Sequence, residues 1–141
     1  MNELQPFWER VHEVTEFCLG HAGKCFGGWS RTTTFLYVGF HALAGTIFVV
    51  REPGSGAIEA VGFAWPFQPG TETAEFNWHP VPPGEALMVR EVVGTRAACR
   101  QMFRQARRRW PFVKRFFAFR QRAARPVLVE YEPTFMERFC S

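Results

Sequence analysis

Residues 86–110 read ALMVREVVGTRAACRQMFRQARRRW, and this stretch predicts a strand, a tight turn and a helix in succession. The apolar run 86–93 has the length and composition of a buried strand. Gly94 interrupts that run, and Thr95 is a residue type that caps helix N-termini. In 96–109, apolar residues recur at helical spacing and arginines occupy the other positions. We therefore expect a strand that leads through a glycine turn into an arginine-faced helix.

The flanking segments predict that 1–141 forms a single α+β domain around a mostly antiparallel sheet. Helical periodicity and capping residues indicate N-terminal helices and a short C-terminal one, at about 4–19, 31–43 and 134–140. Short β-branched or aromatic runs indicate further strands, within 46–50, 60–67, 115–120 and 126–131.

The first two strands should pair as a hairpin spanning residues 46–65. The turn residues Pro53-Gly54-Ser55-Gly56 lie between them, and we expect the hairpin to lie beside the strand at 86–93. The next segment, 67–85, holds four prolines together with Trp78 and His79, and it predicts a long surface loop. Long loops are often functional.

Composition excludes several classes of protein. Apolar residues make up 47% and aromatic residues 16%, so the chain is not intrinsically disordered. No apolar run reaches the roughly 18 residues of a membrane span, and the acidic N-terminal segment does not resemble a signal peptide, so we expect a cytoplasmic protein. The four cysteines are scattered without paired spacing, and we expect no metal site.

The charge is distributed unevenly along the chain. Residues 1–88 carry 4 Lys and Arg against 9 Glu, a net charge of −5, whereas residues 89–141 carry 13 against 4, a net charge of +9. The basic half could face nucleic acid or a phosphate-bearing cofactor. The chain contains no Asp, so every carboxylate role falls to Glu.

Glu91 is the candidate catalytic residue because it interrupts an apolar strand. A buried carboxylate must be paired or protonated, and burial raises its pKa toward the range of a general base. Strict alternation would place Glu91 on one face with Val89 and Val93. We expect it to line a cleft with a residue of the 67–85 loop, most plausibly His79 or Trp78, and His79 is the second candidate catalytic residue. A salt bridge or an edge-facing position is the alternative.

Two other histidines are weaker candidates. His41 lies in an apolar stretch and fits a hydrogen-bonded core residue, while His21 lies in a glycine-rich connection. Each could transfer a proton near neutral pH. The sequence does not choose between them and His79.

The order of these elements resembles the GNAT acyltransferase superfamily over residues 30–131. In that family the turn after the central strand binds the pyrophosphate of acyl-CoA, and the stretch that matches it here is Gly94-Thr95-Arg96-Ala97. A helix N-terminus is a general anion site. The resemblance implies an acyl-CoA-dependent N-acyltransferase, using acetyl-CoA or a longer acyl-CoA, that acylates an amine on a small molecule or a protein.

The chain is also similar to the toxin-activating lysine acyltransferases, a divergent GNAT-like group. The matching residues are Gly62-Phe63-Ala64-Trp65, then Trp78 and Gly84, then the strand that carries Glu91. Glu91 stands where those enzymes have a catalytic Asp. Their catalytic His, which follows a Ser near the first helix, has no counterpart, because Ser30 is followed by Arg.

Two alternatives remain open at the level of sequence. A GNAT-like fold without catalysis could serve as a binding or interaction protein. The basic C-terminal half could instead form a nucleic-acid-binding module, in which arginines contact phosphates and aromatic residues stack on bases.

Overall fold

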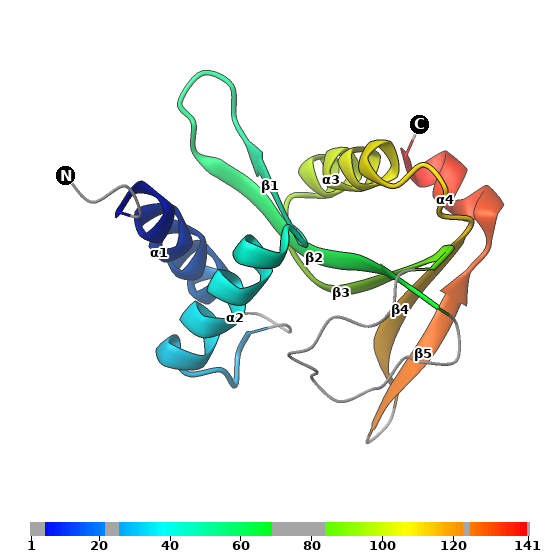
Figure 1. Cartoon of the computed structure of the whole chain (residues 1–141), viewed down its shortest axis with the longest axis horizontal. Helices are drawn as coiled ribbons and strands as arrows, with labels where there is room; N and C mark the ends of the chain where they lie inside the picture. The colour runs from blue at the N-terminus through cyan, green and yellow to red at the C-terminus, as the bar shows by residue number, and fades with distance from the viewer. Residues whose placement is uncertain (1–4, 22–25, 69–83, 123–124, 141) are drawn as a thin grey trace.

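The structure is a computed structural model that describes residues 5–21, 26–68, 84–122 and 125–140. Its helices and strands follow one another in the predicted order (Figure 1). They are α1 (Gln5–Gly20), α2 (Arg31–Ala44), β1 (Ile47–Arg51), β2 (Ile58–Phe67), β3 (Ala86–Gly94), α3 (Arg96–Arg109), β4 (Arg115–Arg122), β5 (Arg125–Tyr131) and α4 (Pro133–Cys140).

The strands form one sheet in the order β1-β2-β3-β4-β5. All neighbours are antiparallel except β3 and β4, which are parallel because α3 carries the chain back to the same end of the sheet. The α+β prediction is confirmed. The predicted hairpin is confirmed as well, since β1 pairs with β2 across a turn that contains Gly56 at φ +74°.

Local capping explains why the helices begin and end where they do. At the start of α2, the Ser30 side chain accepts a hydrogen bond from the Thr33 amide at 3.1 Å. Gly45 ends α2 in the left-handed conformation, with φ 72°. Thr95 caps α3 in the same way as Ser30, accepting from the Ala98 amide at 3.2 Å. These caps were predicted from sequence.

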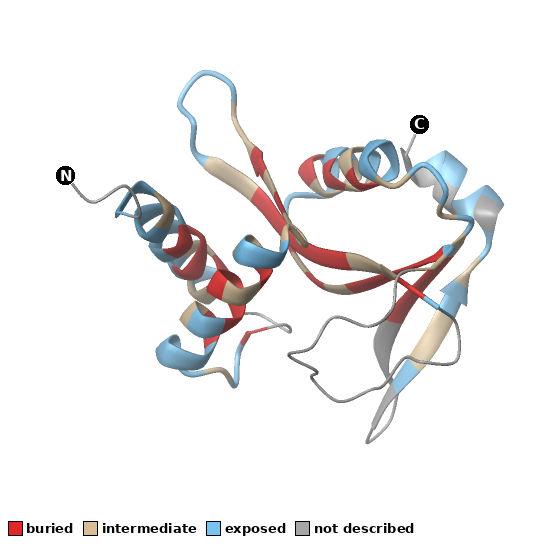
Figure 2. Cartoon of the chain, viewed as in Figure 1, coloured by how far each residue is buried: buried red, intermediate tan, exposed pale blue. Residues whose placement is uncertain are grey.

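The sheet is covered on both faces. Helices α1 and α2 pack on one face of the first strands and α3 packs on the other, so β1 and β2 lie between two layers of helix (Figure 1). Buried residues concentrate on the central strands and on the helix sides that face them (Figure 2). Strand β2 contributes to both layers, because Ala60 and Ala64 pack on the α3 side whereas Val61 and Phe63 pack on the side of α1 and α2.

Gly94 is required by the fold itself. Its φ is +134°, and a Cβ atom at this position would collide with the Glu59 carbonyl oxygen and lie 2.6 Å from the Ala60 Cα atom. Only glycine allows β3 to end against β2 and turn directly into α3.

Candidate functional site

A β-bulge in β3 is the feature that organises the candidate site. Gly62 of β2 pairs with Val92 of β3, but Ala64 pairs with Val89. Two residues of β3, Arg90 and Glu91, therefore lie opposite one residue of β2. A bulge of this kind bends the strand and redirects side chains.

The bulge overturns the expected alternation along β3. Val89, Glu91 and Val93 do not share a face, because Val89 packs with the α3 layer while Val93 packs with α1 and α2. The extra residue turns Glu91 toward α2. Arg90 stays beside it, with its Nε atom 3.9 Å from Glu91 Oε1, and both side chains are largely buried.

Tyr37 is the direct partner of Glu91. Its hydroxyl donates a hydrogen bond to Glu91 Oε2 at 2.7 Å inside the core. Burial raises the pKa of the Glu91 carboxyl above its ordinary value, while the Tyr37 hydrogen bond and Arg90 act in the opposite direction. Burial and the nearby Glu91 raise the pKa of Tyr37 well above its usual value of 10. The Tyr37 phenol therefore keeps its proton and donates it in the hydrogen bond to Glu91.

His41 lies one turn after Tyr37 on the same side of α2. Only 3% of it is exposed, and its ring stacks on Trp65 with centroids 5.2 Å apart. Its Nδ1 atom is 2.6 Å from the Thr46 hydroxyl, whereas the buried Nε2 atom has no hydrogen-bond partner among the described residues. Burial, together with the charge of Arg90, lowers its pKa from 6.5 to about 4. His41 is thus a neutral core residue, as the sequence suggested.

Sequence reasoning missed Tyr37. A signal was present, because residues 37 and 41 are four apart and lie on one face of a helix. Tyr37 and the buried His41 therefore share the inward face of the helix, and this face places polar groups in the core. Nothing local, however, connects that face to Glu91, which is 54 residues away along the chain.

The parallel strands separate at the bulge. The β3–β4 pairing covers Ala86 to Val89 and their partners Arg115 to Ala118. Strand β3 continues to Gly94 and β4 to Arg122, and the two strands run side by side at their starts and then diverge (Figure 1). Glu91 and the turn that follows it therefore belong to the part of β3 beyond its pairing with β4.

The predicted anion-binding turn lies directly after this part of β3. Gly94, Thr95, Arg96 and Ala97 are all exposed, and they form the start of α3. The Thr95 amide donates to the Glu59 carbonyl at 3.2 Å, and the Thr95 hydroxyl takes the Ala98 amide. The first amides of α3 have no acceptor within the helix, and they lie at the positive end of its dipole.

His79 and Trp78 lie outside the described residues, so the expected cleft between them and Glu91 stays a prediction. Within the ranges that the structure describes, no three His, Cys or Glu side chains form a group that could hold a metal ion. In those same ranges, no helix is long and apolar enough to cross a membrane.

Comparison with known proteins adds no relative. No protein-family model matches the chain, and no curated protein matches it.

Proposed function

We propose that the chain is an acyl-CoA-dependent N-acyltransferase of the GNAT-like type. The observation that carries this proposal is the part of β3 that continues beyond its pairing with β4 and leads into α3. The parallel pairing ends at Val89, the bulge with buried Glu91 follows at once, and the exposed N-terminus of α3 begins at Thr95. A strand edge that is no longer paired, next to a helix N-terminus, offers backbone groups to an extended ligand with a phosphate group at one end.

The proposed reaction assigns one role to each part. The acceptor amine would attack the thioester carbonyl carbon, so that the C–N bond forms, the C–S bond breaks, and the thiolate that leaves takes up the proton that the amine has lost. Glu91 accepts the amine proton, and Tyr37 holds the carboxyl group in place through its hydrogen bond. Gly94 to Ala97 bind the pyrophosphate. Three residues at about 3.3 Å each separate Glu91 from Gly94 by roughly 10 Å, which suits a ligand that spans both positions.

Ligand binding is the first test. A ligand that binds only the folded protein raises its melting temperature, so acetyl-CoA and longer acyl-CoAs should each raise the midpoint. Arg96→Glu places a negative charge at the first turn of α3 and should abolish this shift. Arg107→Glu, at the far end of the same exposed helix side, is the matched control and should leave the shift nearly intact.

The same experiment separates the alternatives. Equal losses in the two variants, with a shift produced by a short oligonucleotide, would favour a diffuse polyanion surface and the nucleic-acid-binding function. No shift with any acyl-CoA would remove the cofactor from the proposal.

Activity is the second test. Glu91→Gln keeps the size of the side chain but removes the proton acceptor, so turnover should fall about 100-fold or more while the fold stays intact. Glu130→Gln is the control, because Glu130 is an exposed residue of β5 that pairs with Arg115. Unchanged turnover in Glu91→Gln would assign Glu91 a purely structural role. No turnover in the original chain would favour a GNAT-like binding protein.

A further inference from the structure

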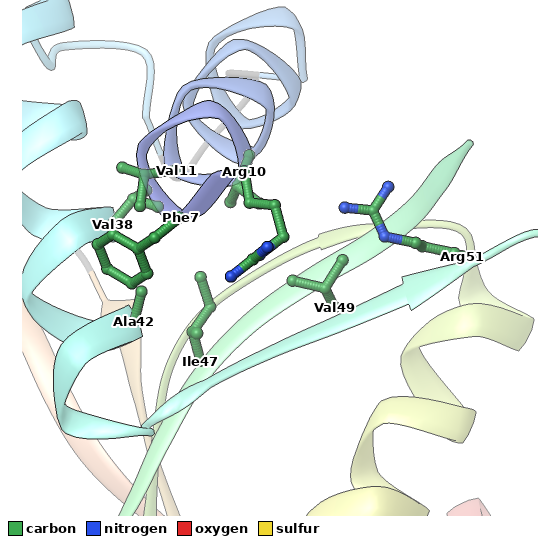
Figure 3. A pocket seen from close by; sticks show the side chains of 9 residues that line it. Phe7, Arg10, Val11, Val38, Ala42, Ile47, Val49 and Arg51 are labelled. Carbon is green, nitrogen blue, oxygen red and sulfur yellow. The ribbon is translucent and has the colours of Figure 1, made fainter. Parts of the chain in front are cut away.

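A cavity of about 320 Å³ lies between α1, α2 and β1, on the sheet face opposite α3. Strand β1 is the edge of the sheet, so the cavity lies away from the β3–β4 pair. Figure 3 shows the residues that line it. They are Phe7, Arg10, Val11, Val14, Val38, Ala42, Ile47, Val49 and Arg51.

The interior of this cavity is apolar. The valines at its base are core residues, with exposed fractions of 2% for Val11, 4% for Val14 and 0% for Val38. Ile47 and Val49 of β1 form the opposite wall and are half-buried. Seven of the nine lining residues have no polar side-chain atom. An apolar ligand tail that binds here would therefore leave water for an apolar environment, which favours binding.

The two remaining lining residues are arginines, and only one of them is neutralised. Arg51 donates to both carboxylate oxygens of Glu13, at 2.6 and 3.0 Å, and also to the Gly56 carbonyl. Arg10 is exposed and makes no hydrogen bond or ion pair with any residue that the structure describes. Its side chain extends from α1 toward Ile47 in Figure 3. The cavity therefore has one uncompensated positive charge at its rim.

The size of the cavity decides what kind of ligand fits. Small-molecule sites measure about 300–1,000 Å³, and this one is at the lower end of that range. A helix with its side chains is about 10–12 Å across, so even two turns of a partner helix would need far more room. A single slender tail fits, and a folded peptide or a two-tailed lipid does not.

We propose that this cavity binds a small carboxylate with one unbranched apolar tail, such as a medium-chain fatty acid. The tail would occupy the space between the valines and β1, and the carboxylate would pair with the Arg10 guanidinium, which can form two parallel hydrogen bonds to it. This site does not depend on the proposed acyltransferase function, because it uses other residues on another part of the sheet.

Isothermal titration calorimetry on the whole chain with octanoate tests the proposal. Each buried methylene contributes enough to tighten binding about fourfold, so hexanoate, octanoate and decanoate should differ by about fifteenfold from one to the next, until the cavity is full. Octanol and octylamine share the tail but lack the negative charge. Both should bind at least tenfold more weakly than octanoate, since one salt bridge and its hydrogen bonds are lost.

Variants separate the contributions of charge and space. Arg10→Gln should lower octanoate affinity to that of octanol while octanol affinity stays unchanged. Ala42→Phe fills the cavity from α2 and should abolish binding of both. Val49→Phe fills the cavity from β1 and should also abolish binding. It is the test to use if Ala42→Phe lowers the melting temperature. Arg108→Gln, an exposed arginine of α3, should bind octanoate like the original chain.

Three outcomes would overturn the proposal. The first is no octanoate binding at millimolar concentration by a folded chain. The second is octanol or octylamine binding as tightly as octanoate, which would remove the role of Arg10. The third is octanoate binding by Ala42→Phe and Val49→Phe as tight as by the original chain, which would place the ligand elsewhere.

Discussion

Glu91 is buried against α2 because β3 contains one extra residue at the bulge. Without it, period-two alternation would place residue 91 on the face of Val89, which packs toward α3. The β-bulge therefore causes the Glu91 carboxyl group to contact α2 and not α3. Its hydrogen-bond partner is the Tyr37 hydroxyl. A buried carboxyl group that loses its hydrogen-bond donor strongly destabilises the folded protein.

Tyr37→Phe should lower the free energy of unfolding by about 1.5–3 kcal/mol at pH 7, since it removes only the hydroxyl that donates to Glu91. Urea unfolding of this variant measures the loss. In a double-mutant cycle with Glu91→Gln, the two losses should be clearly non-additive. Additive losses would show that the 2.7 Å contact contributes nothing to stability.

His41 predicts a specific dependence of stability on pH. Its pKa falls from 6.5 in the unfolded chain to about 4 in the folded one, so the folded state favours the neutral ring. The stability that His41 contributes is therefore fully present above pH 6.5 and is lost as the pH falls toward 4. The difference between these two pKa values corresponds to about 3 kcal/mol.

Urea unfolding at pH 7, 5.5 and 4 measures this effect. His41→Phe should lose much less stability over this range than the original chain, because its side chain cannot become protonated. The exposed His12 provides the control, and His12→Gln should keep the original pH profile. Parallel profiles for His41→Phe and the original chain would contradict the prediction.

At the scale of elements, the unit β3–turn–α3 depends on local chemistry at both of its junctions. Thr95 satisfies the Ala98 amide at the start of α3, and Gly94 takes a backbone conformation that other residues rarely adopt. The turn proposed to bind pyrophosphate is therefore already fixed by the fold. A glycine here is explained by packing against β2, whether or not a phosphate binds.

Gly94→Ala should cost about 3 kcal/mol or more in the free energy of unfolding, because the added Cβ meets the backbone of Glu59 and Ala60 at a φ of +134°. Thermal unfolding followed by circular dichroism measures this loss. Gly20→Ala is the control. Nothing lies within 4 Å of a Cβ atom at position 20, which is the last residue of α1, so the change should be neutral or slightly stabilising. Similar losses at both positions would contradict the steric explanation.

At the scale of the whole molecule, β2 joins two packed layers. Its alternate residues enter the α3 core and the core under α1 and α2, so neither layer can lose its packing without exposing the same strand. We therefore expect the layers to unfold together, as small domains usually do.

Substitutions in opposite layers test this cooperativity. Met102→Ala, in the core under α3, should cost about 2–5 kcal/mol, and Val38→Ala, in the core under α2, about 1.5–3 kcal/mol. Each variant should still show one transition, at the same midpoint by tryptophan fluorescence and by far-ultraviolet circular dichroism. Two separate transitions in either variant would show that the layers are independent.

Local sequence signals predicted the helices and strands and several of the residues at which they begin or end. Ser30, Gly45, Gly94 and Thr95 act on backbone groups within a few residues of themselves, so their roles could be predicted from neighbouring residues. The hairpin at 46–65 was predictable for the same reason, since turn residues and short apolar runs are local signals.

The surroundings of the candidate site, in contrast, depend on tertiary contacts. The bulge at Arg90 and Glu91 depends on how β2 and β3 pair, and a one-residue change of register leaves no mark on local composition. The meeting of Tyr37 with Glu91 requires α2 to pack on that face of the sheet. The cavity below Arg10 likewise depends on how α1 and α2 pack against β1. Local propensities act over a few residues, whereas these contacts join segments far apart in the chain, and only folding brings them together.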